Sequence, residues 1–282
     1  MTPTTLPDLV ISFDLDEVLL PRPIGRCVFP VVVLELAKEI AESHKKPLQT
    51  VVEELRHRIE LENQRRVGND HGLLSAYDWD SIFTTVVRSL GLQQQVRIAP
   101  YVEALCQNPR DIPAYPGVWE GLTRLRELGT RLLVVTNGYA RYQLPVLRAL
   151  GLDQFFERIA TSDVAGCAKP DPRIFRWAFQ GLDGRRNIHV GDWLQQDVYG
   201  AHQAGLEAIW FRRDLPEPLA SLAPKERPSS PAFRLLIEAR LYREGVQASD
   251  LTPYWPEYVV RDLDELPEVL GFDPRTDREI KF

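Results

Sequence analysis

The sequence predicts an α/β fold, a doubly wound parallel sheet with an inserted α-helical domain. Three observations lead to this prediction. The apolar run 9–13 ends at Asp14, as a buried parallel strand does when polar residues follow its carboxyl end. Residues 28–106 show apolar positions at helical spacing, with no convincing strand between them. After residue 117, short strands and helices alternate, which is typical of a doubly wound sheet.

The inserted part contains four predicted helices, at 29–40, 48–61, 79–90 and 96–105. The stretch that follows, 108–117, contains Pro109, Pro113 and the turn pair Pro116-Gly117, so it marks a boundary. We therefore expect residues 1–20 and 113–282 to form the core, and residues 21–112 to form a separate helical domain.

In the remainder of the core, predicted helices and strands alternate. Helices are expected at 118–128, around 144–150, and at 173–180 and 198–204; strands are expected at 131–136, 159–160, 188–190, 208–211 and 258–260. Segment 213–256 departs from the alternation, because it is rich in Pro and Ser and then contains a short predicted helix at 233–243. We expect it to be an insertion within the core.

Composition limits the class of protein. A chain of 282 residues with 44% hydrophobic and 26% charged residues is ordinary for a globular protein that buries a core. No apolar run approaches the roughly 18 residues of a membrane span, no signal-peptide pattern is visible, and the three cysteines are scattered. We expect a cytoplasmic protein, a monomer or a homodimer. The net charge of −6 argues against a nucleic-acid partner.

Two carboxylates stand at the end of the first predicted strand. Asp14 and Asp16 follow an apolar run directly, and buried carboxylates need a partner. A hard cation such as Mg²⁺ is one such partner. A division of labour, in which one carboxylate attacks while the other transfers protons, is another explanation. A solvated loop or a helix cap is the simpler alternative.

Polar residues also end the next strands. Thr136, Asn137 and Gly138 follow the second strand, where a hydroxyl, an amide and backbone N–H groups suit a phosphate, or a turn with a helix N-cap. Lys169 follows the third strand and could neutralise a phosphate, or be an ordinary surface lysine.

The fourth core strand ends at Gly191 and Asp192, with Asp197 five residues on. These carboxylates suit a cation site, or a turn and a helix cap. Each group alone is a modest signal. Because the carboxyl ends of parallel strands meet at one edge of a sheet, we expect all four groups to lie together.

Four segments resemble the motifs of the haloacid dehalogenase superfamily, in the right order and at fitting spacing. They are ISFDLDEVLL, LLVVTNGYARYQ, GCAKPDPRIFRWAF and IHVGDWLQQDVYGAHQAG. The resemblance implies a Rossmann-like core with a helical cap domain inserted after the first motif, and it covers most of the chain outside that insertion.

The resemblance also implies roles for the motif residues. Asp14 would attack phosphorus and form an aspartyl-phosphate, and Asp16 would act as the general acid and base. Lys169 would pair with Asp14 and the phosphate. The remaining roles are phosphoryl binding by Thr136 and Asn137, Mg²⁺ binding by Asp14, Asp192 and the backbone carbonyl of Asp16, and support of the metal site by Asp197.

The implied activity is a Mg²⁺-dependent phosphatase for a small phosphorylated metabolite, a sugar phosphate or a nucleoside monophosphate. Dehalogenases of this superfamily typically lack the second aspartate, whereas Asp16 is present here. Phosphonatases use a cap lysine, and Lys38, Lys45 and Lys46 keep that option open. The same core would also suit a phosphomutase or a non-catalytic binding protein.

Substrate choice is expected to depend on the cap loop 65–72, through Arg65, Arg66 and His71, because the core motifs all serve the phosphoryl group that every substrate shares. A plain interhelical turn is the alternative. Segment 213–256 follows a strand whose carboxyl end faces the site, so we expect it near the mouth of the site, unless it is a surface embellishment or a dimer contact.

Overall fold

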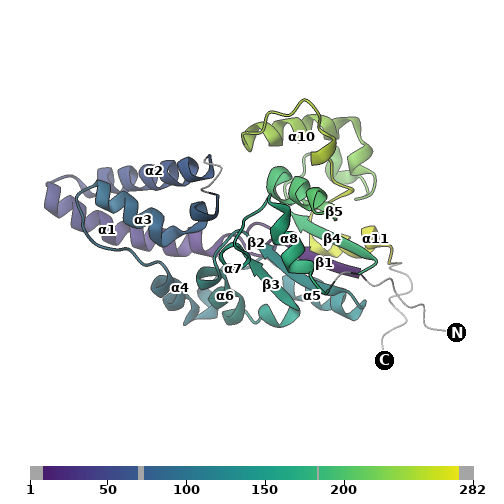
Figure 1. Ribbon diagram of the computed structural model, residues 1–282, viewed down its shortest axis with the longest axis horizontal. Coiled ribbons are helices and arrows are strands. Elements are labelled where there is room, and N and C mark those ends of the chain that lie inside the picture. Colours follow the sequence, from purple (N-terminus) through teal and green to yellow (C-terminus); the bar gives the residue numbers. More distant parts are fainter. Residues whose placement is uncertain (1–8, 69–72, 183, 273–282) are drawn as a thin grey trace.

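The computed structural model describes residues 9–68, 73–182 and 184–272. Its centre is a six-stranded sheet in the order β3-β2-β1-β4-β5-β6, in which every neighbouring pair is parallel (Figure 1). The strands are β1 (Leu9–Phe13), β2 (Arg131–Thr136), β3 (Arg158–Thr161), β4 (Arg186–Gly191), β5 (Glu207–Phe211) and β6 (Tyr258–Val260). The predicted parallel α/β fold is confirmed.

Helices cover both faces of the sheet because successive side chains of a strand point to opposite faces. In β1, Leu9, Ile11 and Phe13 belong to one hydrophobic cluster and Val10 belongs to the other. The first cluster also contains residues of α5 (Val118–Glu127), α6 (Ala140–Ala149) and α11 (Leu266–Leu270); the second contains residues of α8 (Pro172–Phe179), α9 (Gly200–Gln203) and α10 (Pro231–Arg243). The sheet is therefore doubly wound.

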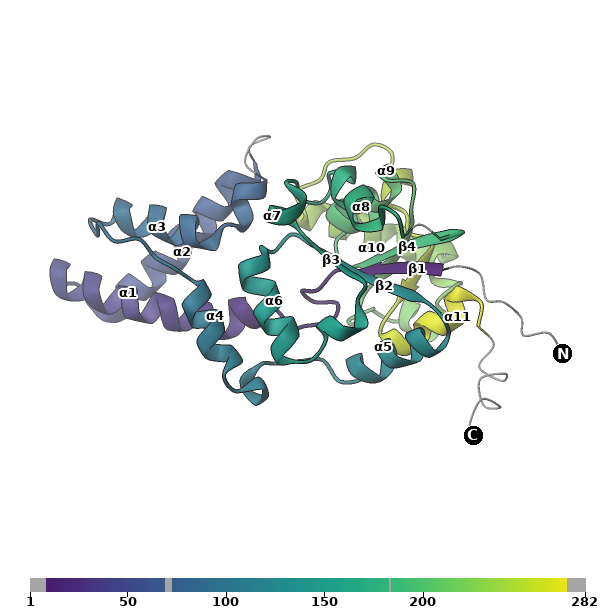
Figure 2. The same ribbon diagram turned by 60° about the horizontal axis from the view of Figure 1, so that its bottom comes forward.

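Between β1 and β2 lies a helical insertion, here residues 24–106. Its helices are α1 (Phe29–His44), α2 (Leu48–Val67), α3 (Trp79–Ser89) and α4 (Ala99–Cys106). Figures 1 and 2 show α1, α2 and α3 as one body beside the sheet, whereas α4 packs against the core helix α6. All four helices fall within the predicted cap domain, 21–112, whose bounds remain a prediction.

The structure refines several predicted elements. The helix expected at 198–204 begins as a π-helical turn, Leu194–Tyr199, and continues as α9. Helix α6 spans Ala140–Ala149 and includes Pro145, so the helix expected around 144–150 is present and extends four residues further toward its N-terminus. A short helix, α7 (Ser162–Ala165), precedes the Lys169 loop. Among the described residues, no helix is long and apolar enough to cross a membrane.

Candidate active site

Strand register brings the predicted site residues to one edge of the sheet. Phe13 of β1 is paired with Val134 of β2 and with Val190 of β4. Asp14 follows β1 directly, Thr136 is the last residue of β2 and is followed by Asn137, and Asp192 follows β4 directly. These residues therefore all lie at the carboxyl end of the sheet. The Asp14 N–H donates to the Val190 carbonyl at 2.9 Å, which fixes the Asp14 backbone.

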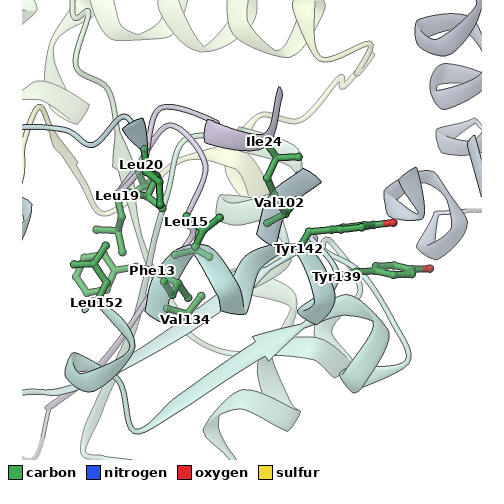
Figure 3. Close-up of a cluster of buried hydrophobic side chains, with 14 of the residues drawn as sticks. Phe13, Leu15, Leu19, Leu20, Ile24, Val102, Val134, Tyr139, Tyr142 and Leu152 are labelled. Atoms are coloured by element: carbon green, nitrogen blue, oxygen red, sulfur yellow. The ribbon is translucent and has the colours of Figure 1, made fainter. Parts of the chain in front are cut away.

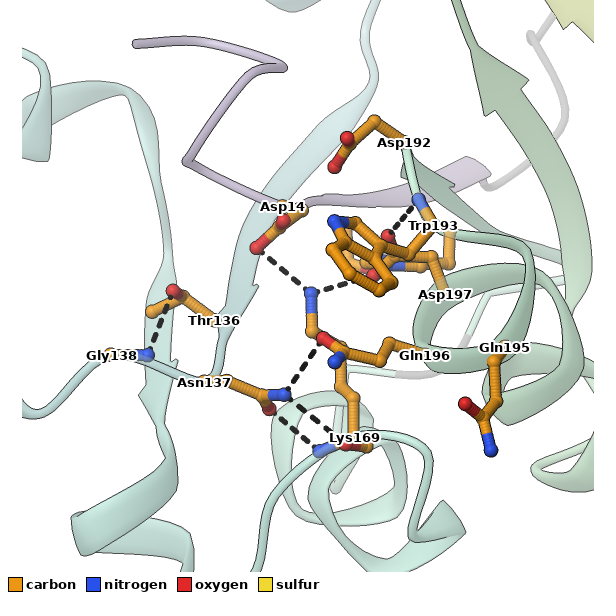
Figure 4. Close-up of polar contacts among 12 residues, drawn as sticks. Asp14, Thr136, Asn137, Gly138, Lys169, Asp192, Trp193, Gln195, Gln196 and Asp197 are labelled. Atoms are coloured by element: carbon orange, nitrogen blue, oxygen red, sulfur yellow. Dashed lines mark hydrogen bonds and ion pairs between the residues drawn. The ribbon is translucent and has the colours of Figure 1, made fainter. Parts of the chain in front are cut away.

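A buried lysine joins two of the carboxylates (Figure 4). Lys169 Nζ lies 2.8 Å from Asp14 Oδ1 and 2.6 Å from Asp197 Oδ1. Burial lowers the pKa of Lys169, but the charges of Asp14 and Asp197 outweigh burial, so the net pKa is raised. Lys169 is therefore a fixed cation directly beside the Asp14 carboxylate, where it can offset the negative charge of an incoming phosphate.

Behind Lys169, a polar chain runs into the sheet. Asp197 Oδ1 also lies 3.1 Å from His189 Nε2, and His189 Nδ1 lies 2.8 Å from the Ser12 hydroxyl. Burial lowers the pKa of His189, so this ring is neutral at pH 7. Burial alone would raise the pKa of Asp197, but Lys169 and His189 hold it below its usual value. Asp197 thus stays ionised and positions Lys169.

Asp192 has the features of a ligand for a hard cation. Its Oδ1 is buried and has no hydrogen-bond partner among the described residues. Carboxylate oxygens of Asp14, Asp192 and Asp197 lie within 4.8 Å of one another. Burial and the charges of Asp197 and Asp14 raise the pKa of Asp192 well above its usual value. An unpaired buried oxygen among converging carboxylates fits Mg²⁺, which prefers oxygen ligands.

Asp16 has a different environment from Asp14. Its Oδ2 accepts a hydrogen bond from Gln143 Nε2 at 3.3 Å. Burial, then the charge of Asp14, raises the pKa of Asp16 to about 7. Figure 3 shows Leu15, between the two aspartates, among buried side chains that include Leu19 and Leu20. A carboxyl with this pKa can both donate and accept a proton near neutrality.

The Asn137 side chain makes hydrogen bonds that the sequence did not predict. Its Oδ1 accepts the Lys169 backbone N–H at 2.6 Å, and its Nδ2 lies 3.1 Å from the Lys169 carbonyl. The Asn137 side chain therefore holds the Lys169 loop, in addition to the phosphoryl role expected from the sequence. Thr136 is buried, and its hydroxyl accepts the Gly138 N–H at 3.2 Å. The phosphate contacts of both residues remain predictions.

Two residues that the sequence analysis missed complete this edge. Tyr77, in the helical insertion, accepts hydrogen bonds from Asn137 Nδ2 at 3.0 Å and from Gln196 Nε2 at 3.1 Å. Burial raises the pKa of Tyr77, so its hydroxyl is protonated. No local pattern marks Tyr77, because its role depends on how the insertion packs on the core. His189, by contrast, was visible as a polar residue inside an apolar strand.

Two of the three residues predicted to choose the substrate lie in the described part of the chain, and the contacts of both are within the insertion. Arg66 is buried, and its guanidinium donates to Glu62, to the Ser75 carbonyl and to the hydroxyls of Ser81 and Thr85. Arg65 is exposed and pairs with Glu62 at 2.8 Å. His71 lies outside the described residues. This geometry does not favour substrate contact by Arg66, which holds α2 against its neighbours.

Segment 213–256 reaches the site, as expected. Glu244, just after α10, accepts hydrogen bonds from the Leu194 and Gln195 N–H groups at 3.0 and 2.8 Å. Arg240 Nη2 donates to the Asp192 carbonyl at 3.1 Å. The inserted segment therefore contacts the loop that carries Asp192.

Comparison with known proteins agrees with this geometry. Residues 9–205 match the haloacid dehalogenase-like hydrolase family, and this range includes all of the site residues contributed by β1, β2, β4 and the Lys169 loop. The chain belongs to this family. Segment 213–256 lies beyond the matched range.

Sequence matches to named relatives cover part of the chain. It is 36% identical over 168 residues to glyceraldehyde 3-phosphate phosphatase of Pyrococcus furiosus, a match of 58% of each chain. It is 34% identical over 141 residues to phosphoserine phosphatase of Thermus thermophilus, covering 49% of this chain and 54% of that protein. The chain thus spans little more than half the length of these relatives.

A solved structure supports the fold. The haloacid dehalogenase phosphatase from Thermococcus onnurineus aligns with a TM-score of 0.62 over 94% of this chain and 98% of that chain, at 24% identity. At this level of identity, the likeness extends to the arrangement of helices and strands.

Proposed function

We propose that this protein is a Mg²⁺-dependent phosphatase that hydrolyses a small phosphorylated metabolite through an aspartyl-phosphate on Asp14. The observation that carries the proposal is the pairing of Asp14 with Lys169 at 2.8 Å, near Asp192 Oδ1, which has no hydrogen-bond partner in the part of the chain that the structure describes. A carboxylate that attacks a phosphate dianion meets charge repulsion, and a cation on each side offsets it. The phosphatases among its relatives support the same reaction.

The chemistry divides between the two aspartates. Asp14 attacks phosphorus with one carboxylate oxygen, and the bond between phosphorus and the leaving oxygen breaks. Asp16 donates a proton to that oxygen. Asp16 then accepts a proton from water as the water attacks phosphorus, which releases phosphate and restores Asp14. Asp16 fits both steps, because its pKa of about 7 allows either protonation state.

Mg²⁺ would be held by the side chains of Asp14 and Asp192 and by the Asp16 carbonyl, and when bound it would supply positive charge to the phosphoryl oxygens. Lys169 supplies the second positive charge, and Asp197 keeps it in place. Thr136 and Asn137 would bind the phosphoryl oxygens.

The helical insertion would act as the cap that excludes water from this reaction. Tyr77 supports this assignment, because its hydroxyl bonds to Asn137 and Gln196 of the core. The insertion also contains a cavity of about 530 Å³, whose lining residues include Phe29, Arg56, Trp79 and Phe83. The substrate would be a phosphorylated sugar, nucleoside or comparably small metabolite.

The test is a screen of phosphorylated metabolites with Mg²⁺ present, with wild type and Asp14→Asn. We expect phosphate release by wild type, its loss with EDTA, and its loss in Asp14→Asn, because an amide is a poor nucleophile. Asp250→Asn is the matched control, since Asp250 is exposed and caps a turn at Thr252. Turnover by Asp14→Asn within a few-fold of wild type contradicts the proposal.

The screen also separates the competing activities. A phosphomutase would transfer the phosphoryl group and show little hydrolysis unless a phosphosugar acceptor is supplied. A dehalogenase would release halide from 2-haloacids with EDTA present. A non-catalytic protein would bind metabolites without releasing phosphate.

A further inference from the structure

The loop that carries Asp192 is held by a carboxylate from outside the four motifs. The Glu244 side chain is buried, with 1% of its surface exposed. Its Oε1 accepts the Leu194 N–H at 3.0 Å and its Oε2 accepts the Gln195 N–H at 2.8 Å. Both N–H groups lie within three residues of Asp192, at the start of a helical turn. Hydrogen bonds from backbone N–H groups to a buried carboxylate are strong, so Glu244 fixes the path of the chain after Asp192.

Arg240, one helical turn before Glu244, contacts Asp192 itself. Its Nε donates to Glu244 Oε1 at 2.5 Å, and its Nη2 donates to the Asp192 carbonyl at 3.1 Å. The same Nη2 lies 3.6 Å from Asp192 Oδ2. Its guanidinium also lies over the Trp193 ring, 5.1 Å from the centroid. A single side chain therefore orients the backbone and the carboxylate of Asp192.

The helix that supplies these contacts is itself fixed to the sheet. Phe233, Ile237 and Leu241 of α10 are buried, and the Phe233 ring lies 6.0 Å from the ring of Trp210 on β5. Trp210 Nε1 donates to the Asp192 carbonyl at 2.8 Å, so that oxygen accepts hydrogen bonds from both β5 and α10. Movement of α10 would therefore move Asp192.

We propose that Arg240 and Glu244 are positioning residues, through which segment 213–256 holds the Asp192 loop in the geometry that binds the divalent cation. Arg240 donates to the Asp192 carbonyl and lies beside Asp192 Oδ2. Asp192 Oδ1 has no hydrogen-bond partner among the described residues. The carboxylate is thus oriented with one oxygen left for a metal. The inference rests on the proposed function, because it requires a cation site at Asp192.

The same helix offers a matched control. Arg234 and Glu238 form an ion pair at the same i, i+4 spacing as Arg240 and Glu244, at 2.9 Å, but their side chains are 68% and 44% exposed. Replacing either pair removes the same kinds of group. Of these two pairs, the one formed by Arg240 and Glu244 touches the Asp192 loop.

The experiment measures Mg²⁺ binding by isothermal titration calorimetry without substrate, for Arg240→Met, Arg240→Lys and Glu244→Gln against Arg234→Met and Glu238→Gln. We expect the Mg²⁺ Kd to rise about tenfold or more in the first group, the usual effect of losing a group that orients a metal ligand. Arg240→Lys should recover part of the loss, because it keeps the charge without the planar fork. The control pair should bind Mg²⁺ as wild type does.

Kd values within twofold of wild type in folded Arg240 variants would overturn the inference. If Glu244→Gln fails to fold, the two Arg240 variants still decide it, since Arg240 remains partly exposed at 17% of its side chain. If wild type releases phosphate and binds Mg²⁺, and the variants bind Mg²⁺ equally well, only this inference is refuted. Wild type that neither binds Mg²⁺ nor releases phosphate would refute the proposed function as well.

Discussion

At the scale of single residues, the site depends on how closely Gly191 and Asp197 approach. A Cβ atom placed on Gly191 would lie 2.2 Å from the Asp197 carboxyl carbon, a distance that no side chain tolerates. Asp197 in turn holds Lys169 at 2.6 Å. The absence of a side chain at residue 191 therefore allows the lysine to stand beside Asp14.

We predict that Gly191→Ala displaces Asp197 and destabilises the protein by about 2 kcal/mol or more, as overpacking of a dense core does. The melting temperature and the rate of phosphate release should both fall. Gly25→Ala is the control, because the nearest atom to its new Cβ is Arg22 Cβ at 4.0 Å. Equal melting temperatures for the two variants would contradict the prediction.

Tyr77 gives a second prediction at this scale. Tyr77→Phe removes the hydroxyl that accepts from Asn137 and Gln196, at a cost of about 1 kcal/mol for one net hydrogen bond. We expect kcat/KM to fall about fivefold, and the melting temperature to fall by a few degrees because of the lost hydrogen bond. Tyr101→Phe is the control, because it removes a hydroxyl that bonds to exposed Glu35 on α1. Unchanged kinetics in Tyr77→Phe would show that the contact is incidental.

At the scale of elements, the strands of the core could be predicted from the sequence more fully than the site could. Strands β1, β2 and β6 have the predicted bounds, because each is a short apolar run with a clear stop. For helix α6, the sequence predicted helical structure around 144–150 but not the start at Ala140. The contacts of Tyr77 and Glu244 could not be predicted, because they join elements far apart in the chain.

Helix α2 is held in place by one of its own residues, Arg66. Arg66→Ala removes donors to Glu62, Ser75, Ser81 and Thr85 and leaves the largely covered Glu62 carboxylate with one fewer partner. We expect a loss of about 2 kcal/mol in the free energy of unfolding, with kcat/KM nearly unchanged for large and small substrates. A selective loss of kcat/KM on the natural substrate would restore the role expected from the sequence.

The control for Arg66 lies next to it. Arg65 also pairs with Glu62, but 62% of its side chain is exposed, so Arg65→Ala should leave the free energy of unfolding close to that of wild type. Chemical denaturation of the two variants makes the comparison.

At the scale of the whole molecule, the sheet and the helical insertion meet at α6. Arg141 of α6 pairs with Asp78 and Asp80 of the insertion, at 2.5 and 3.3 Å. The Tyr142 hydroxyl accepts the Asp80 N–H at 3.0 Å. These contacts, together with Tyr77, bring the insertion beside the carboxyl ends of the strands, where the alternating pattern of the sequence had predicted a site.

The central claim is that Asp14 becomes covalently phosphorylated. The most direct measurement is to quench the enzyme during turnover, reduce it with borohydride, and map the residue that changes by peptide mass spectrometry. An acyl phosphate is reduced to an alcohol, so the account predicts homoserine at position 14 only when substrate is present. Phosphate release with an unmodified Asp14, or with the change at Asp16, would contradict it.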